Sequence, residues 1–128
     1  MKLLLDSHTF LWAIQQPEQL SEVATTALQD MTNLLLVSLV TLWELQIKND
    51  LGKLALVKPL RQMIEDEVEA GRMSILPITA EHIYALLGLP LHHRDPFDRL
   101  LIAQAQVEGA TLVTKDHLIV LYPVPTLW

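Results

Sequence analysis

Short apolar runs alternate along this chain with longer segments of helical periodicity, and this alternation constrains the fold more than any other feature. The runs at Lys2–Leu5, Leu34–Val37, Ser74–Leu76 and Leu112–Thr114 have the length and composition of buried strands. Strands separated by helices form βαβ units, in which neighbouring strands run parallel and helices cover both faces of the sheet. The sequence therefore predicts an α/β fold, a three-layer α/β/α sandwich with a central, mainly parallel sheet.

Helix start and stop signals delimit the segments between these strands. The predicted helices span Ser7–Gln15, Ser21–Met31, Ser38–Asn49, Pro59–Ala70 and Thr79–Gly88. The clearest start is Asp95–Pro96–Phe97–Asp98, which combines an N-cap Asp, a proline in the first turn and an acid at the third position. This last helix runs to Glu108, and Gly109 ends it. Val120–Tyr122 predicts a short additional edge strand.

The composition favours one compact domain over residues 1–128, without a linker or an internal repeat. Hydrophobic residues make up 51% of the chain and charged residues 19%, which excludes intrinsic disorder. Surface scaling predicts that a chain of this size buries about two-thirds of its surface. The 27 leucines are more apolar surface than a small monomer usually hides, so we expect a protein partner or self-association.

Composition also excludes several classes of site. The chain has no cysteine, which rules out disulfides, zinc–thiolate centres and cysteine nucleophiles. Its longest uncharged stretch, Met31–Trp43, is too short to span a bilayer, and no signal peptide is recognisable, so we expect a cytoplasmic protein without membrane contact. A net charge of −6 argues against a basic groove across the whole surface. An acidic protein can still act on phosphates when its carboxylates hold divalent cations.

Four acids are expected to meet at one edge of the sheet. Asp6 closes the first strand and Asp116 follows the fourth, at the carboxyl edge where parallel sheets place their ligand sites. Glu44 lies one to two turns into the helix after the second strand, and Asp98 lies in the first turn of the helix before the fourth. Mg²⁺ or Mn²⁺ would offset the repulsion among these carboxylates. Two such ions can activate water for phosphodiester cleavage.

Hydroxyl side chains lie next to these acids in the sequence. They could hydrogen-bond the carboxylates or a water on the metal, and they belong to Ser7, Thr9, Ser38 and Thr114. Asp95 is a further acid, but its position favours a helix N-cap over a metal ligand. Asp6 and Asp98 could also serve only as helix caps, and Asp116 as a turn residue.

Basic side chains flank the acids and could contact RNA phosphates. They are Arg94, Arg99, Lys115 and His93, for most of which a solvated surface charge is the plainer interpretation. His92 and His93, together with Asp95, resemble a metal-ligand cluster. Because they precede a proline-anchored helix start, we expect them in a loop at the pocket rim, and a transition-metal site there is a minor alternative.

Several segments, in one order along the chain, together resemble a known family. They are Leu3–Trp12, Ser38 with Leu42–Leu45, His93–Ala103 and Leu112–Asp116. In this order and over nearly the whole chain they match the PIN-domain proteins, and most closely the toxin ribonucleases of VapBC-type toxin–antitoxin pairs. One departure is Ser7, where the family usually has Thr, and it retains a hydroxyl.

The resemblance implies a metal-dependent endoribonuclease with a pocket formed by Asp6, Glu44, Asp98 and Asp116. The first three look like the main metal-site acids, and Asp116 completes the pocket. The resemblance also implies homodimers and neutralisation by a small DNA-binding antitoxin that fills the active-site groove. Hydrolysis by an activated water would leave a 5′-phosphate and a 3′-hydroxyl, because the 2′-hydroxyl is not the nucleophile.

Two other functions are compatible with the residues. One is a phosphohydrolase or phosphotransferase with Asp6 as the covalent nucleophile. Asp6–Ser7–His8–Thr9 loosely matches an Asp-x-Asp-x-Thr motif, although His8 stands where that motif needs its second acid. A PIN-fold module that binds without cutting is the other, and the presence of all four acids weighs against it. Aromatic residues make up only 5% of the chain and indicate no stacking platform, so we expect RNA shape to govern substrate choice.

Overall fold

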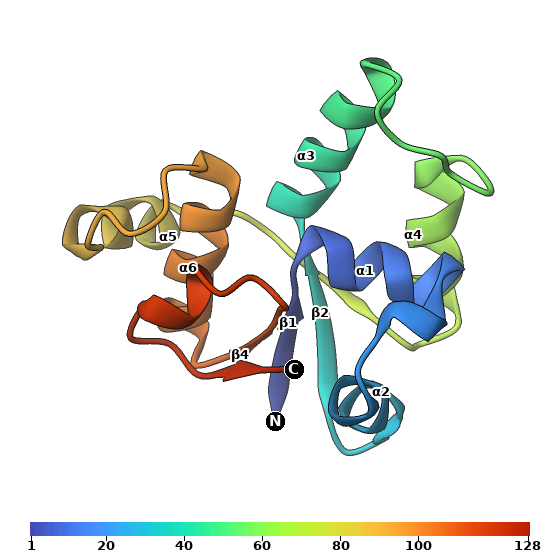
Figure 1. Cartoon of the computed structure of the whole chain (residues 1–128), viewed down its shortest axis with the longest axis horizontal. Helices are drawn as coiled ribbons and strands as arrows, with labels where there is room; N and C mark the ends of the chain where they lie inside the picture. Colours follow the sequence, from blue (N-terminus) through green and yellow to red (C-terminus); the bar gives the residue numbers. More distant parts are fainter.

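The centre of the molecule is a five-stranded sheet in the order β3-β2-β1-β4-β5, in which every neighbouring pair is parallel (Figure 1). A computed structural model describes all residues, 1–128. The strands are β1 (Lys2–Leu5), β2 (Leu34–Ser38), β3 (Ser74–Leu76), β4 (Thr111–Val113) and β5 (Thr126–Leu127). The predicted α/β architecture with a parallel central sheet is confirmed.

Helices follow the predicted segments closely. They are α1 (Ser7–Gln15), α2 (Glu22–Gln29), α3 (Leu39–Asp50), α4 (Leu60–Glu69), α5 (Ala80–Ala85) and α6 (Pro96–Glu108), with short 3₁₀ turns η1 (Pro17–Gln19), η2 (Leu86–Gly88) and η3 (Ile119–Leu121). Side chains of Asp6, Ser21, Ser38, Thr79 and Asp95 accept backbone N–H groups at five helix starts. None of the helices combines the length and the apolar character that a membrane span requires.

The side chains of β1 alternate between two separate core layers. Leu3 and Leu5 pack in one layer with Phe10 of α1 and with residues of α2 and α4. Leu4 packs in the other layer, against Leu101 and its neighbours on α6. Because both faces of the sheet are covered, its central strands are nearly continuous apolar runs, with polar residues only at their ends, as is typical of parallel sheets.

The predicted edge strand at Val120–Tyr122 is wrong. Ile119–Leu121 forms the turn η3, and the edge strand β5 lies further on, paired with β4. The Asp116 carboxylate accepts the N–H of Leu118, and the Asp116 backbone carbonyl accepts the N–H of Ile119. These bonds form a turn, so the residues after Asp116 do not continue as an extended strand. The turn also brings the fully buried Ile119 into the core.

Candidate active site

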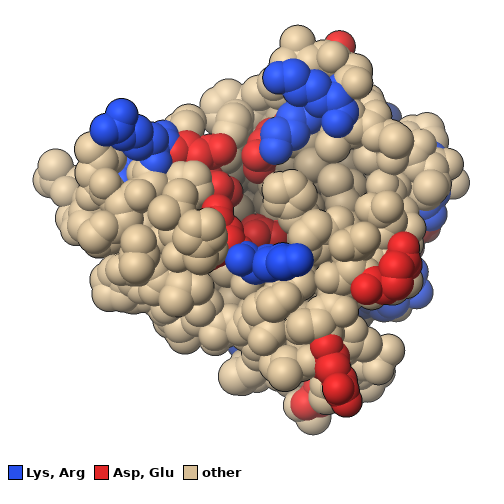
Figure 2. Space-filling view, viewed as in Figure 1, with Lys and Arg blue, Asp and Glu red and all other residues tan.

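Five carboxylates line one pocket of about 360 Å³ that opens where β1 and β4 end. They belong to Asp6, Glu44, Asp95, Asp98 and Asp116. Figure 2 shows acidic side chains gathered in a hollow of the surface, with basic groups at its rim. The structure therefore brings together the four predicted metal-site acids from four distant parts of the chain, together with Asp95.

Asp6 caps α1 and faces the pocket at the same time. It is only 6% exposed, and its Oδ1 accepts the N–H of Thr9 at 2.8 Å. Its Oδ2 accepts the hydroxyl of Thr114, and the Thr114 oxygen in turn accepts the N–H of Asp116. Thr114 thus links two of the pocket acids, as expected for a hydroxyl that orients carboxylates.

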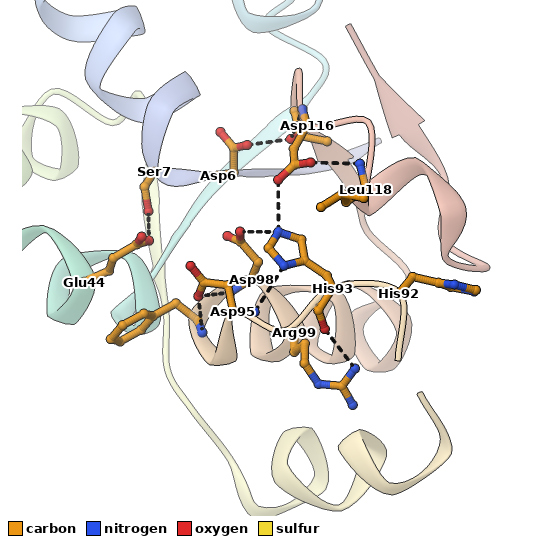
Figure 3. Close-up of polar contacts among 12 residues, drawn as sticks. Asp6, Ser7, Glu44, His92, His93, Asp95, Asp98, Arg99, Asp116 and Leu118 are labelled. Carbon is orange, nitrogen blue, oxygen red and sulfur yellow. Dashed lines mark hydrogen bonds and ion pairs between the residues drawn. The ribbon is translucent and has the colours of Figure 1, made fainter. Parts of the chain in front are cut away.

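Glu44 is a buried carboxylate with two partners. It is 5% exposed on α3, and its Oε1 accepts the hydroxyl of Ser7 (Figure 3). Its Oε2 pairs with Nζ of Lys48 at 2.8 Å. Such partners are needed because an unpaired buried carboxylate is strongly unfavourable. Lys48 was not among the predicted site residues, although its spacing of four residues from Glu44 on one helix is a recognisable signal.

His93 lies between two of the acids. Its Nε2 is 2.9 Å from Oδ2 of Asp98 and 3.1 Å from Oδ2 of Asp116 (Figure 3). Its Nδ1 accepts the backbone N–H of Asp95 at 3.1 Å. A neutral ring that accepts at Nδ1 carries its proton on Nε2, so His93 donates to the two carboxylates.

This tautomer also bears on metal binding by His93. The Nε2 of His93 and one oxygen each of Asp98 and Asp116 lie within 4.8 Å of one another, close enough for three ligands of one ion. Coordination through Nε2 would move the ring proton to Nδ1, where it would face the N–H of Asp95. The arrangement therefore favours His93 as a hydrogen-bond donor over His93 as a transition-metal ligand.

Asp95 and Asp98 have different roles at the start of α6. Oδ1 of Asp95 accepts the N–H groups of Phe97 and Asp98, which is the predicted N-cap. Asp98 does not close a capping box; its carboxylate turns to His93 (Figure 3). In a capping box the Asp98 carboxylate would accept the N–H of Asp95; here Nδ1 of His93 accepts that N–H, which leaves the Asp98 carboxylate to the pocket.

Asp98 carries the marked electrostatic perturbation in the pocket. Burial, followed by the negative charges of Asp95 and Glu44, raises the pKa of Asp98 to about 7. A positive charge on the nearby His93 would oppose this shift, and the negative charge of Asp6 adds to it. The carboxylates of the pocket thus carry more negative charge than its basic side chains neutralise. A proton on Asp98 or a bound cation would reduce the repulsion among them.

Two predicted hydroxyl residues lie elsewhere. The hydroxyl of Thr9 donates to the carbonyl of Val113 and ties α1 to β4. The hydroxyl of Ser38 donates to Gln104, in a buried polar network that reaches His82 on α5. Both side chains are fully buried and neither lines the pocket.

The predicted basic residues also separate. Lys115 lines the acid pocket, whereas Arg94 and Arg99 line a different depression beside the start of α6. Nη1 of Arg99 donates to the carbonyls of Pro90 and His93 and to the Tyr122 hydroxyl, so Arg99 fastens the loop that carries His93. These contacts give Arg99 a structural role.

Three further pocket residues were not predicted from the sequence as part of the site. His8 and Trp12 come from α1, and His117 follows Asp116. The spacing of His8 and Trp12, four residues apart on a helix that begins at Ser7, could have indicated that they share a face. His117 lies in a turn without periodicity, and no comparable signal marks it.

The chain is similar to known proteins over most of its length. The family model described as the PIN domain matches residues 3–121. Ribonuclease VapC22 of Mycobacterium tuberculosis is 32% identical over 117 residues, which cover 90% of this chain and 87% of the relative.

Solved structures share the fold. The VapBC2 structure from Rickettsia felis, bound to a DNA fragment from its promoter, gives a TM-score of 0.73 at 19% identity and covers 98% of this chain and 97% of its own. The DNA-bound VapBC structure from Salmonella typhimurium has a TM-score of 0.69 and is 17% identical. The match covers 98% of this chain and 96% of that chain. With the family model spanning nearly the whole chain, the resemblance predicted from the sequence is confirmed, and the chain belongs to the PIN domain family.

Proposed function

We propose that the chain is a divalent-metal-dependent endoribonuclease of the VapC toxin type. The observation that carries the proposal is the convergence of Asp6, Glu44, Asp98 and Asp116 on one pocket, with Asp98 half-buried among like charges. Membership of the PIN domain family and similarity to a relative named as a ribonuclease support it. The proposal covers residues 1–128 as a single domain.

The donor set fits a hard divalent cation. Carboxylate oxygens are the ligands that Mg²⁺ and Mn²⁺ prefer, and Asp6, Glu44, Asp98 and Asp116 would supply them. The raised pKa of Asp98 is consistent with this fit, because burial and then the nearby negative charges disfavour the ionised carboxylate, and a bound cation would offset both effects. When bound, such an ion would acidify a water and stabilise negative charge on the phosphodiester.

The remaining contacts hold the carboxylates in place. Ser7 and Thr114 donate hydroxyl hydrogen bonds to Glu44 and Asp6. His93 donates from Nε2 toward Asp98 and Asp116. These hydrogen bonds fix the directions of the acceptor oxygens before any ligand arrives, which lowers the reorganisation needed on binding. In-line attack by water would leave a 5′-phosphate and a 3′-hydroxyl.

The proposal includes partners. We propose that a small DNA-binding antitoxin neutralises the chain and that the chain forms a homodimer in the cytoplasm. The solved neighbours are VapBC complexes, two of them bound to DNA, which supports an antitoxin partner. Exposed apolar side chains also favour protein contacts: Trp43 on α3 is 58% exposed and Leu87 in η2 is 96% exposed.

An aspartyl nucleophile receives less support from the geometry. Asp6 is 6% exposed, and both of its carboxylate oxygens already accept hydrogen bonds, from Thr9 and Thr114. An in-line attack on phosphorus needs an accessible oxygen. The other alternative is a module that acts by binding alone and cuts no RNA. An RNA cleavage assay distinguishes this module from a ribonuclease.

The deciding experiment is RNA cleavage by the purified chain with Mn²⁺, with EDTA, and after the substitution Asp98→Asn. We expect cleavage in Mn²⁺ only, and a loss of about a hundredfold or more in the Asp98→Asn variant, with an unchanged circular dichroism spectrum. Glu69→Gln, on the exposed surface of α4, is the matched control and should cut normally. Full activity in EDTA or in Asp98→Asn would contradict the proposal.

A further inference from the structure

Aromatic rings form a stack on one side of the acid pocket, against the expectation from composition. The rings of His8 and Trp12 stack with their centroids 5.4 Å apart and their planes 29° apart. Trp128 packs against Trp12 from the end of the chain, at 5.8 Å and 58°. Few as the aromatic residues are, the fold gathers two of its three tryptophans at this point.

The stack is open on the His8 side. His8 is exposed, whereas Trp12 and Trp128 are half-buried. One face of the imidazole rests on Trp12, which leaves the outer part of His8 available to a further ring. Covering this outer surface of His8 with a further ring would remove more apolar surface from water, which favours stacking of a ligand there.

The position of the stack follows from α1. Asp6 is the N-cap of this helix, so His8 lies in its first turn and Trp12 one turn later on the same side. Both rings line the pocket that holds the carboxylates of Asp6, Asp98 and Asp116. A ligand on the metal-site acids therefore lies next to an exposed aromatic surface.

Positive charge borders the same surface. Nζ of Lys115 lies 6.0 Å from the centre of the Trp12 ring, and Lys115 and His117 both line the pocket. Lys115 makes no ion pair with the neighbouring acids. An aromatic platform beside an unpaired ammonium group combines the two features that bind single-stranded nucleic acid, base stacking and phosphate contact.

We infer that the His8–Trp12 stack binds an unpaired nucleobase of the RNA substrate, with Lys115 on an adjacent phosphate. This inference rests on the proposed ribonuclease function and adds a binding subsite to it, an aromatic platform for one base beside the metal-site acids. A base held in a duplex is covered on both faces by its neighbours and cannot stack on His8. Stacking contributes little sequence preference, because every base has a π-face.

Binding of a fluorescent RNA tests the inference directly. The probe is a single-stranded RNA with one 2-aminopurine, titrated with the full chain in Ca²⁺, with gels of the same samples to verify that the RNA stays intact. Stacking quenches 2-aminopurine, so we expect quenching by the native chain and about a tenfold weaker Kd with His8→Ala. His8→Phe should bind within about threefold of the native chain, because it keeps an aromatic ring.

Two controls make the result specific to stacking. Tyr84→Ala removes an aromatic ring that is 68% exposed on α5, outside the pocket, and should leave Kd and quenching unchanged. An RNA with an abasic site at the stacked position should bind the native chain and His8→Ala equally. The abasic site and the substitution each remove the same contact, the stacking of the base on His8. Equal binding by the native chain and His8→Ala on intact RNA would overturn the inference. So would rescue by His8→Lys but not by His8→Phe, which would indicate a charge contact.

The stacking site and the ribonuclease function can be refuted independently of each other. If the native chain cuts RNA in Mn²⁺ and His8→Ala neither weakens binding nor slows cleavage, the stacking inference is wrong and the ribonuclease proposal stands. If the native chain cuts no RNA but still quenches the probe in a His8-dependent manner, the ribonuclease proposal is wrong and the stacking site stands as a binding site.

Discussion

The Nδ1 atom of His93 accepts the backbone N–H of Asp95 at 3.1 Å, and this one contact sets the chemistry of the opposite ring nitrogen. With Nδ1 used as an acceptor, the neutral ring presents an N–H at Nε2 to the oxygens of Asp98 and Asp116. His93 thus takes the Asp95 N–H that Asp98 would accept in a capping box at the start of α6, and the Asp98 carboxylate accepts from Nε2 of His93 in the pocket instead.

The first prediction concerns this tautomer. Nitrogen chemical shifts of the His93 ring should identify a neutral imidazole protonated at Nε2 in the metal-free protein at pH 8. Removing the donor in His93→Ala frees two carboxylates to move, so Mn²⁺ binding should weaken about tenfold or more, measured by titration calorimetry. His93→Gln, which can restore an N–H donor, should recover part of the affinity. Stronger Mn²⁺ binding in His93→Ala would contradict the proposed positioning role.

The second prediction concerns pH and stability in the absence of divalent ions. The pKa of Asp98 is raised from 3.8 to about 7, so between these values the folded protein holds a proton that the unfolded chain has released. The free energy of unfolding must then fall as the pH rises through this window, by on the order of 2–4 kcal/mol for this group, and the decline ends above the folded pKa. Urea unfolding in EDTA at several pH values measures it.

Asp98→Asn is the matched variant for this measurement. It removes the titrating group, so the decline between about pH 4 and 7 should be smaller than in the native chain, and the variant should be the more stable protein at pH 8. An identical pH dependence in the two proteins would show that Asp98 titrates normally.

The third prediction concerns the cation. An ion that binds the folded pocket and not the unfolded chain adds about 2.7 kcal/mol to stability when its free concentration is a hundred times Kd. We expect Mn²⁺ to raise the Tm of the native chain and of Glu69→Gln, and to leave that of Asp98→Asn nearly unchanged. Because a proton on Asp98 competes with the ion, the rise in Tm should be smaller at pH 5.5 than at pH 8. Equal Mn²⁺-induced shifts in the native chain and Asp98→Asn would place the ion elsewhere.

Parts of this site could be predicted from the sequence because they follow from sheet geometry. Asp6 and Asp116 come just after β1 and β4, and parallel strands end at one edge, so their meeting needs no knowledge of loops. Ser38 shows the limit of that reasoning. It shares a face of β2 with Leu36, which packs in the α6 layer, and its hydroxyl accordingly meets Gln104. Strand alternation alone could have placed it there.

The loop residues could not be predicted in the same way. His93 lies in a segment without helical or strand periodicity, and its orientation depends on the Asp95 backbone and on Arg99, which donates to its carbonyl. The path of the chain after Asp116 likewise depends on tertiary contacts, because Ile119 enters the core and β5 pairs with β4 only after the turn η3. Such contacts join segments that are distant in the sequence.

The last prediction separates two buried threonines that the sequence treats alike. The Thr114 hydroxyl donates to Asp6 in the pocket, whereas the Thr9 hydroxyl donates to the Val113 carbonyl outside it. Thr114→Val should weaken Mn²⁺ binding and slow RNA cleavage, because it leaves a pocket carboxylate oxygen without its donor, and Thr114→Ser should restore both. Thr9→Val should lower the free energy of unfolding by about 0.5–1.5 kcal/mol, since it removes one of the two hydrogen bonds that the Val113 carbonyl accepts and leaves the one from the Asp6 N–H.

Calorimetry and urea unfolding on the same preparations distinguish the two roles. Thr9→Val should bind Mn²⁺ with the native Kd once it is folded, because its hydroxyl touches no pocket carboxylate. Thr114→Val should lose affinity even under conditions where it is fully folded. If both variants lost Mn²⁺ affinity to the same extent, the effect would come from general loosening of the β1–β4 edge, and the specific role assigned to Thr114 in orienting Asp6 would be wrong.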